Sequence, residues 1–126
     1  MARILVIEDN PDNMTLSVLL LHSAGHTVFS AVDAEAGLTL AHAELPDLIL
    51  MDIQLPGMDG LQATGLLKGH HATAAIPIIA LTALAMKGDE ERIRAAGCDG
   101  YIAKPMSVHG FLRAIAAQLA AKTIAA

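Results

Sequence analysis

Polar residues with the chemistry of a phosphoryl-transfer site follow four of the apolar runs in this sequence. Glu8 and Asp9 come directly after the first run, Asp52 after the third, Thr82 after the fourth and Lys104 after the fifth. Carboxylates that lie close together repel one another, and their pKa values rise unless a cation lies among them. A carboxylate can attack phosphorus when a metal and a positive side chain neutralise the developing charge. If these side chains meet in the fold, they predict a metal site and an aspartyl phosphate.

The expected ligands of this metal are oxygen atoms. Asp9 and Asp52 are the expected direct carboxylate ligands, the backbone carbonyl of Gln54 is a third, and Glu8 acts through a bound water. A small set of oxygen ligands favours Mg2+, with Mn2+ as the alternative. Zn2+ is disfavoured because the chain offers no clustered Cys or His in its sequence. Adjacent His70 and His71 are expected to be exposed in a loop without a third ligand.

The other two residues would act on the phosphoryl group. Lys104 would supply positive charge, and the Thr82 hydroxyl would donate to a phosphoryl oxygen and pull its loop inward. Each residue also has a structural interpretation: Asp52 could cap a turn, Thr82 could serve β-propensity, and Lys104 could be a surface lysine. Their occurrence together favours the site.

These residues need a scaffold that brings the ends of several strands together. Apolar runs of strand length predict strands over residues 4–7, 27–31, 48–51, 76–81 and 100–103. Boundary signals predict helices over residues 11–24, 34–45, 61–68, 86–96 and 108–121. Such alternation favours an α/β fold, a doubly wound parallel sheet with helices on both faces. Ligands bind at the carboxyl ends of the strands of such a sheet, where the candidate residues fall.

Length and composition restrict the other possibilities. A chain of 126 residues predicts one domain spanning residues 1–126, with 122–126 frayed at the end of the last helix. The net charge of -5 and scattered basic residues disfavour nucleic-acid binding. The apolar runs are too short for membrane insertion, and export looks unfavourable because acidic residues interrupt the first run. The lone Cys98 fits the cytoplasm.

Four segments, in this order and spacing, resemble the receiver domains of bacterial two-component response regulators. They are Ile7-Glu8-Asp9-Asn10, Leu50-Met51-Asp52-Ile53-Gln54-Leu55-Pro56-Gly57-Met58-Asp59-Gly60, Leu81-Thr82-Ala83 and Tyr101-Ile102-Ala103-Lys104-Pro105. The resemblance implies a flavodoxin-like (CheY-like) five-stranded sheet of order 2-1-3-4-5. Residues 85–94 look more narrowly like those of single-domain cell-division regulators.

The resemblance also implies a mechanism. Asp52 would be the phosphoacceptor, and the donor would be a histidine on a sensor kinase or phosphotransfer protein. Tyr101 would be a switch residue that moves inward as Thr82 engages the phosphate, although half-buried packing is its structural alternative. Pro105 would be structural and aim the lysine before it. The fourth helix, fifth strand and fifth helix would form the output face toward a kinase, phosphatase or scaffold protein.

Alternative functions stay open at this point. The acidic pair is Glu8-Asp9 rather than two aspartates, and Gln54 leaves the dephosphorylation rate open. A phosphatase with an aspartate nucleophile would need a second acid at position 54, where the chain has Gln54, so turnover of an external substrate is not expected. The chain could instead be a pseudo-receiver that acts by binding alone, or the receiver part of a larger hybrid kinase.

Overall fold

The computed structural model describes the backbone of residues 2–82, 87–103 and 108–125, and their side chains except those of 87 and 121–125. The strands are β1 (Arg3–Ile7), β2 (Thr27–Ala31), β3 (Leu48–Asp52), β4 (Ile78–Thr82) and β5 (Gly100–Ala103). The helices are α1 (Pro11–Ser23), α2 (Ala34–Glu44), α3 (Gly60–Lys68), α4 (Lys87–Ala95) and α5 (Val108–Ala125). All neighbouring strands are parallel, and their order is β2-β1-β3-β4-β5. The predicted sheet and its order are confirmed.

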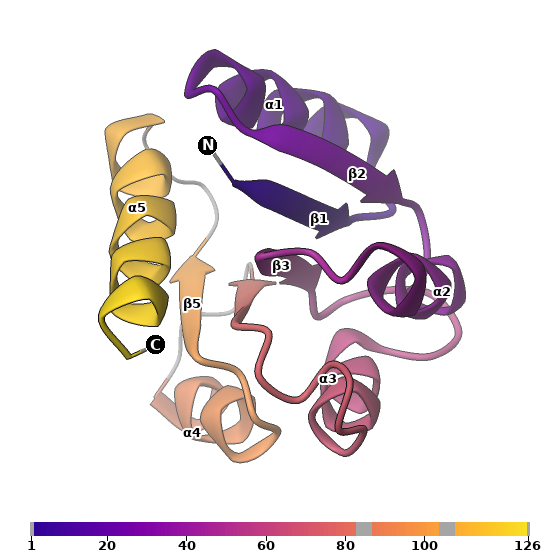
Figure 1. Cartoon of the computed structure of the whole chain (residues 1–126). Helices are drawn as coiled ribbons and strands as arrows, with labels where there is room; N and C mark the ends of the chain where they lie inside the picture. Colours follow the sequence, from indigo (N-terminus) through magenta and orange to yellow (C-terminus); the bar gives the residue numbers. More distant parts are fainter. Residues whose placement is uncertain (1, 83–86, 104–107, 126) are drawn as a thin grey trace.

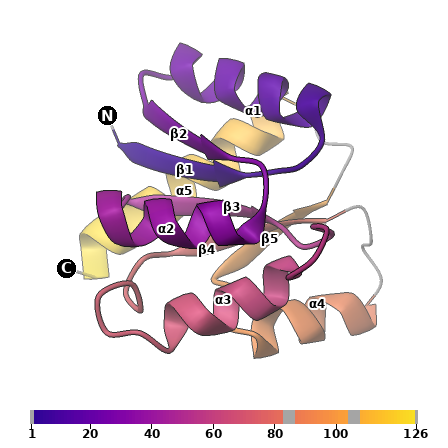
Figure 2. The same cartoon turned by 90° about the vertical axis from the view of Figure 1, so that its right-hand side faces the viewer.

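Helices cover both faces of the sheet (Figures 1 and 2). Helices α1 and α5 lie on one face, and α2, α3 and α4 lie on the other. Successive residues of a strand point to opposite faces, so β3 supplies Leu48 and Leu50 to one apolar core and Ile49 and Met51 to the other. Every residue of β3 is buried, whereas β2, at the sheet edge, is mostly half-buried or exposed. This difference explains why the sequence signal was continuous for β3 and weaker for β2.

Side-chain caps begin the helices beside the site. The Asn10 side chain accepts a hydrogen bond from the Asn13 N–H at 3.0 Å, and Pro11 occupies the first turn. Asp33 accepts from the Ala36 N–H at 2.8 Å in the same way. These caps begin α1 and α2 within a few residues of the ends of β1 and β2, at the edge of the sheet that carries the acidic residues.

The fourth strand begins later than predicted. Residues 76–81 were expected, but β4 starts at Ile78. The Ile76 N–H is used in a turn, where it donates to the Thr73 carbonyl at 3.0 Å. Pro77 has no N–H to donate to a neighbouring strand. The apolar run therefore extends two residues beyond the strand at its amino end.

Lys68 and Asp99 fasten the amino ends of the last two strands. The Lys68 Nζ donates to the carbonyls of Ala74 and Ile76 at 3.3 and 2.8 Å, and to Asp99 Oδ2 at 2.9 Å. The same Asp99 oxygen accepts from the Ile78 N–H at 2.8 Å. These bonds join the end of α3 to the start of β4 and β5, at the sheet edge opposite the strand ends that carry the acidic residues.

Cys98 is buried, and this predicts an unreactive thiol. Burial raises the pKa of the Cys98 thiol, which keeps it protonated and a poor nucleophile. We expect the native protein to react with a soluble disulfide reagent at least about tenfold more slowly than the urea-unfolded protein. An exposed Ser23→Cys variant, in a Cys98→Ser background, is the matched control and should react at the unfolded rate. Equal rates for native and unfolded Cys98 would contradict the burial.

His26 predicts a loss of stability toward acid. Its Nδ1 accepts a hydrogen bond from the Ala2 N–H at 3.1 Å, and burial lowers the pKa of His26 below 6.5. The unfolded chain therefore binds a proton more readily than the folded one, so the contribution of His26 to stability is present above pH 6.5 and is lost as pH falls from there through the lower pKa of the folded state. Urea unfolding at a series of pH values should show a shallower acid loss for His26→Asn. His22→Asn, which removes an imidazole from an exposed position, is the matched control variant.

Candidate functional site

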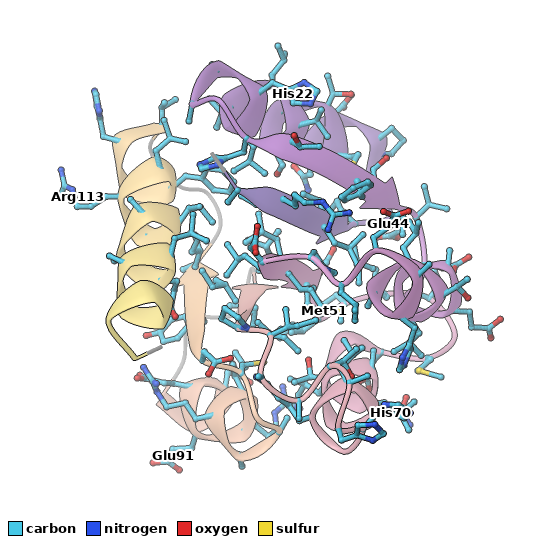
Figure 3. The ribbon with its side chains drawn as sticks, viewed as in Figure 1. His22, Glu44, Met51, His70, Glu91 and Arg113 are labelled. Carbon is cyan, nitrogen blue, oxygen red and sulfur yellow. The ribbon has the colours of Figure 1, made fainter. Side chains whose placement is uncertain are left out.

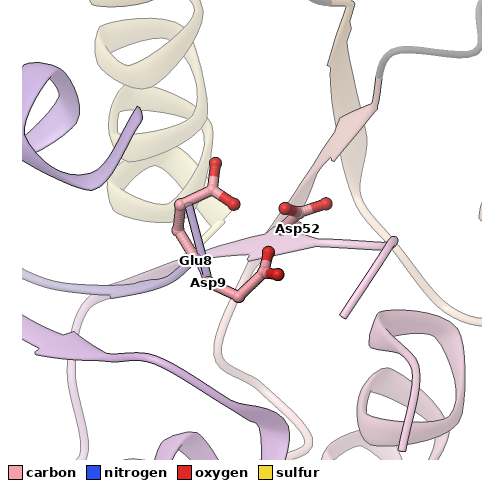
Figure 4. Close-up of side chains that lie close together, drawn as sticks. All are labelled: Glu8, Asp9 and Asp52. Atoms are coloured by element: carbon pink, nitrogen blue, oxygen red, sulfur yellow. The ribbon is translucent and has the colours of Figure 1, made fainter. Parts of the chain in front are cut away.

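Glu8, Asp9 and Asp52 lie together at the carboxyl edge of the sheet. Glu8 and Asp9 follow β1, and Asp52 ends β3, its neighbour in the sheet. Ile7 pairs with Met51, so Glu8, the first residue after β1, lies level with Asp52, the last residue of β3. One carboxylate oxygen from each of the three residues lies within 4.8 Å of the others (Figure 4). The predicted convergence of these side chains is confirmed.

The surroundings of this cluster fit a divalent cation with oxygen ligands. Glu8 is fully buried and Asp52 is only 5% exposed, whereas Asp9 is open to solvent. Like charges at this separation repel strongly away from bulk water. A cation among them offsets that repulsion, and carboxylates are the ligands that Mg2+ and Mn2+ prefer. The donors are thus chemically suited to such an ion, and the exposed Asp9 leaves one side for water.

Backbone hydrogen bonds hold Asp52 in position. Its Oδ1 accepts from the Gln54 N–H at 2.9 Å, which fixes the rotation of the carboxylate. The Ile53 N–H donates to the Leu81 carbonyl at 3.2 Å and ties the turn to β4. Gln54 therefore lies beside Asp52 as expected, with its side chain exposed. Its carbonyl as a metal ligand stays a prediction.

Gly60 is a site residue that the sequence analysis did not assign a role. It is the first residue of α3, and a Cβ built there would lie 2.3 Å from the Asp52 carbonyl oxygen and 2.7 Å from the Ile53 Cα. The Asp59 side chain caps the helix at this point, and Gln62 completes a capping box with bonds of 2.8 and 3.1 Å. The spacing of Asp59 and Gln62 was a usable signal for the start of α3. The close approach of Gly60 to β3 had no local signal.

The other predicted residues are placed as follows. Thr82 ends β4 and is fully buried, one position beyond Leu81, the partner of Asp52 in the sheet. Tyr101 lies in β5 opposite Ala80 and is half-buried, and its hydroxyl donates to Glu90 Oε2 at 3.2 Å. Lys104 and Pro105 lie outside the described residues.

The histidines form an arrangement that the sequence did not predict. His70 (Figure 3) and His71 are exposed as expected. His42, at the end of α2, also contacts His70, with ring centroids 4.7 Å apart. The His70 and His71 rings are stacked with planes 17° apart. Nitrogen lone pairs lie in the ring plane, so those of the stacked pair lie in two nearly parallel planes and do not converge on one ion.

Comparison with known proteins places this site in a family. The model of the response regulator receiver domain matches residues 4–116. The chain therefore belongs to the response regulator receiver domains, the phosphorylation-signalling modules of two-component systems.

Individual relatives agree with this assignment. The polar-differentiation response regulator DivK of Brucella anthropi is 47% identical over 116 residues, which cover 92% of this chain and 94% of that protein. The receiver domain of a sensor histidine kinase from Pseudomonas aeruginosa, solved with a magnesium ion coordinated in its active-site cleft, is 36% identical. It has a TM-score of 0.88 and matches 94% of this chain and 98% of its own. A CheY-like receiver domain protein from Methanospirillum hungatei is 28% identical with a TM-score of 0.91, covering 100% of this chain and 99% of its own.

The helices give one further finding. No helix among the described residues is both apolar and long enough to traverse a lipid bilayer.

Proposed function

We propose that this protein is a phosphorylation switch in which Asp52 accepts a phosphoryl group from a histidine of a sensor kinase or phosphotransfer protein. The observation that carries the proposal is the meeting of Glu8, Asp9 and Asp52 within 4.8 Å at the edge of the sheet. Asp9, Asp52 and the Gln54 carbonyl would hold Mg2+ directly, with Mn2+ as the alternative, and Glu8 would bind it through water. The bound ion would neutralise charge on the carboxylates and on the transferred group.

The residues of the chain have separate roles in the transfer. An oxygen of Asp52 forms the new bond to phosphorus while the bond from phosphorus to the donor histidine nitrogen breaks, and its electron pair leaves with the imidazole. The hydrogen bond from Gln54 orients the attacking carboxylate. Lys104 neutralises the negative charge of the phosphoryl oxygens, and Pro105 aims this lysine. The buried hydroxyl of Thr82 donates to one of those oxygens.

The output is a change of surface rather than turnover of an external substrate. Engagement of Thr82 would move the end of β4, and Tyr101 would change position with it. A kinase, phosphatase or scaffold protein with unequal affinity for the two arrangements would read the switch. We propose that residues 1–126 do this in the cytoplasm as one receiver domain. The Pseudomonas neighbour belongs to a sensor histidine kinase, and operation as part of a larger kinase is the alternative.

The test is labelling by a small phosphodonor. Phosphoramidate with Mg2+ should add one phosphoryl group to the wild-type protein, seen in its intact mass, and the label should be lost with hydroxylamine. Asp52→Asn should take no label, whereas Asp12→Asn, which removes an exposed acid of α1, should be labelled like the wild type. Equal labelling of Asp52→Asn would refute the assignment. A wild type that neither binds Mg2+ nor takes label would instead indicate a pseudo-receiver.

A further inference from the structure

The hydroxyl of Tyr101 is bonded to helix α4. It donates to Glu90 Oε2 at 3.2 Å, and the other oxygen, Oε1, accepts from Arg94 Nε at 3.4 Å. Glu90 and Arg94 are one helical turn apart on α4, so the ion pair fixes the carboxylate that faces the tyrosine. Among the described side chains, the bond from Tyr101 is the one hydrogen bond that joins α4 to β5.

Helix α4 has few other attachments to the protein. Of its described side chains only Ile93 is buried, and the helix is rich in charged residues. At the carboxyl end of α4, the Cys98 N–H donates to the Ile93 carbonyl at 3.3 Å. A helix with little buried apolar surface is held weakly, so each remaining contact has a large share in setting its position. The Glu90 carboxylate is such a contact, and it lies near the start of α4, the end closest to β4 in the sequence.

We propose that Glu90 is a positioning residue that makes helix α4 follow Tyr101 when Asp52 is phosphorylated. This inference rests on the function proposed above, because it requires that Tyr101 change position. A side chain that moves together with its hydrogen-bond partner transmits the movement, and here the partner belongs to the helix. The hydrogen bond between Tyr101 and the Glu90 carboxylate thus couples the position of the switch residue to the position of α4.

The composition of the chain supplies a direct probe of this link. Tyr101 is the single tyrosine, and there is no tryptophan, so tyrosine fluorescence reports on Tyr101 alone. A carboxylate that accepts the phenol hydrogen bond quenches this emission, because the excited phenol is a stronger acid and gives up its proton. Glu90→Ala should therefore raise the emission of the resting protein. Glu91→Ala removes the adjacent acid, which points away from α4 into solvent (Figure 3), and should leave the emission unchanged.

The coupling itself is tested with beryllofluoride and Mg2+, which imitate the phosphoryl group on the carboxylate. In the wild type and in Glu91→Ala, addition should change hydrogen exchange of the amides of residues 89–95. In Glu90→Ala we expect this change to fall at least about fivefold, the factor that one hydrogen bond of ordinary net strength controls. Tyr101→Phe should reproduce the loss, and the double variant should be no worse than either single variant. Glu90→Gln should keep the response, because its amide oxygen can accept the same bond.

The outcomes separate the two proposals. Binding of beryllofluoride is followed independently by the rise in Tm that it causes. If it raises the Tm of a folded Glu90→Ala protein and α4 responds as in the wild type, the coupling role of Glu90 is refuted. Should Glu90→Ala fail to fold, Tyr101→Phe decides in the same way. A wild type whose Tm does not respond refutes the proposed function, and the coupling with it.

Discussion

The Asp52→Asn variant is expected to be more stable than the wild type in the absence of divalent cations, by about 1–3 kcal/mol in free energy of unfolding. Two unit charges no more than 4.8 Å apart repel by about 3 kcal/mol or more at the effective dielectric constant of protein sites. Solvent around Asp9 screens its repulsion with Asp52. If only the repulsion between Glu8 and Asp52 contributes, the stabilisation should fall in the lower half of this range. Removal of the Asp52 charge therefore relieves electrostatic repulsion among the carboxylates of the folded protein.

Mg2+ should reverse the order of the two proteins. A ligand that binds only the folded state stabilises it by about 2.7 kcal/mol at a hundred times its dissociation constant. The wild type should gain this amount, whereas Asp52→Asn, which lacks one of the three carboxylates, should gain much less. Urea unfolding in EDTA and in excess Mg2+ measures both quantities, with Asp12→Asn as the control for a change of net charge. A destabilised Asp52→Asn in EDTA would show that the cluster is not repulsive.

Gly60→Ala is expected to destabilise the protein by about 2–4 kcal/mol and to weaken Mg2+ binding. The new methyl group would lie 2.3 Å from the Asp52 carbonyl oxygen and 2.7 Å from the Ile53 Cα. Both are backbone atoms of a buried segment, so relief requires α3 to move away from β3. Such a movement displaces the turn that carries Gln54 and loosens the hydrogen bond that orients Asp52.

Gly65→Ala is the matched control for this substitution. Gly65 lies in the same helix, and a Cβ there would meet nothing within 4 Å. Alanine is the better helix former, so this variant should be stabilised by about 0.5–1 kcal/mol with Mg2+ binding unchanged. The two variants differ by position alone, and denaturant midpoints compare them directly. If Gly60→Ala were as stable as Gly65→Ala, the close packing of α3 on β3 would be wrong.

The sequence predicted those parts of the fold that depend on local pattern. The continuous apolar run before Asp52 indicated a strand buried on both faces, and β3 is one. Residues at the ends of parallel strands share an edge of the sheet, which is why the meeting of Glu8, Asp9 and Asp52 could be predicted. The order of the strands came from the family resemblance, because alternating elements alone are compatible with several orders.

The features that sequence reasoning missed depend on distant parts of the chain. The approach of Gly60 to the backbone of β3, the contact of His42 with His70, and the bond between Tyr101 and Glu90 each join separate elements. No periodicity or spacing within one segment encodes such pairs. The roles of Lys104 and Thr82 toward a phosphoryl group stay predictions, and labelling of the corresponding variants will decide them.

The hydrogen bonds of Lys68 hold the amino ends of β4 and β5 more firmly than their carboxyl ends. Lys68 and Asp99 clamp β4 and β5 at their amino ends, far from the carboxylates. We therefore expect a structural change that starts at Asp52 to be largest at the carboxyl ends of β4 and β5, because their amino ends are held by these bonds. An insertion at the amino ends of β4 and β5 should consequently leave signalling unchanged. The same insertion between β4 and α4 should alter signalling.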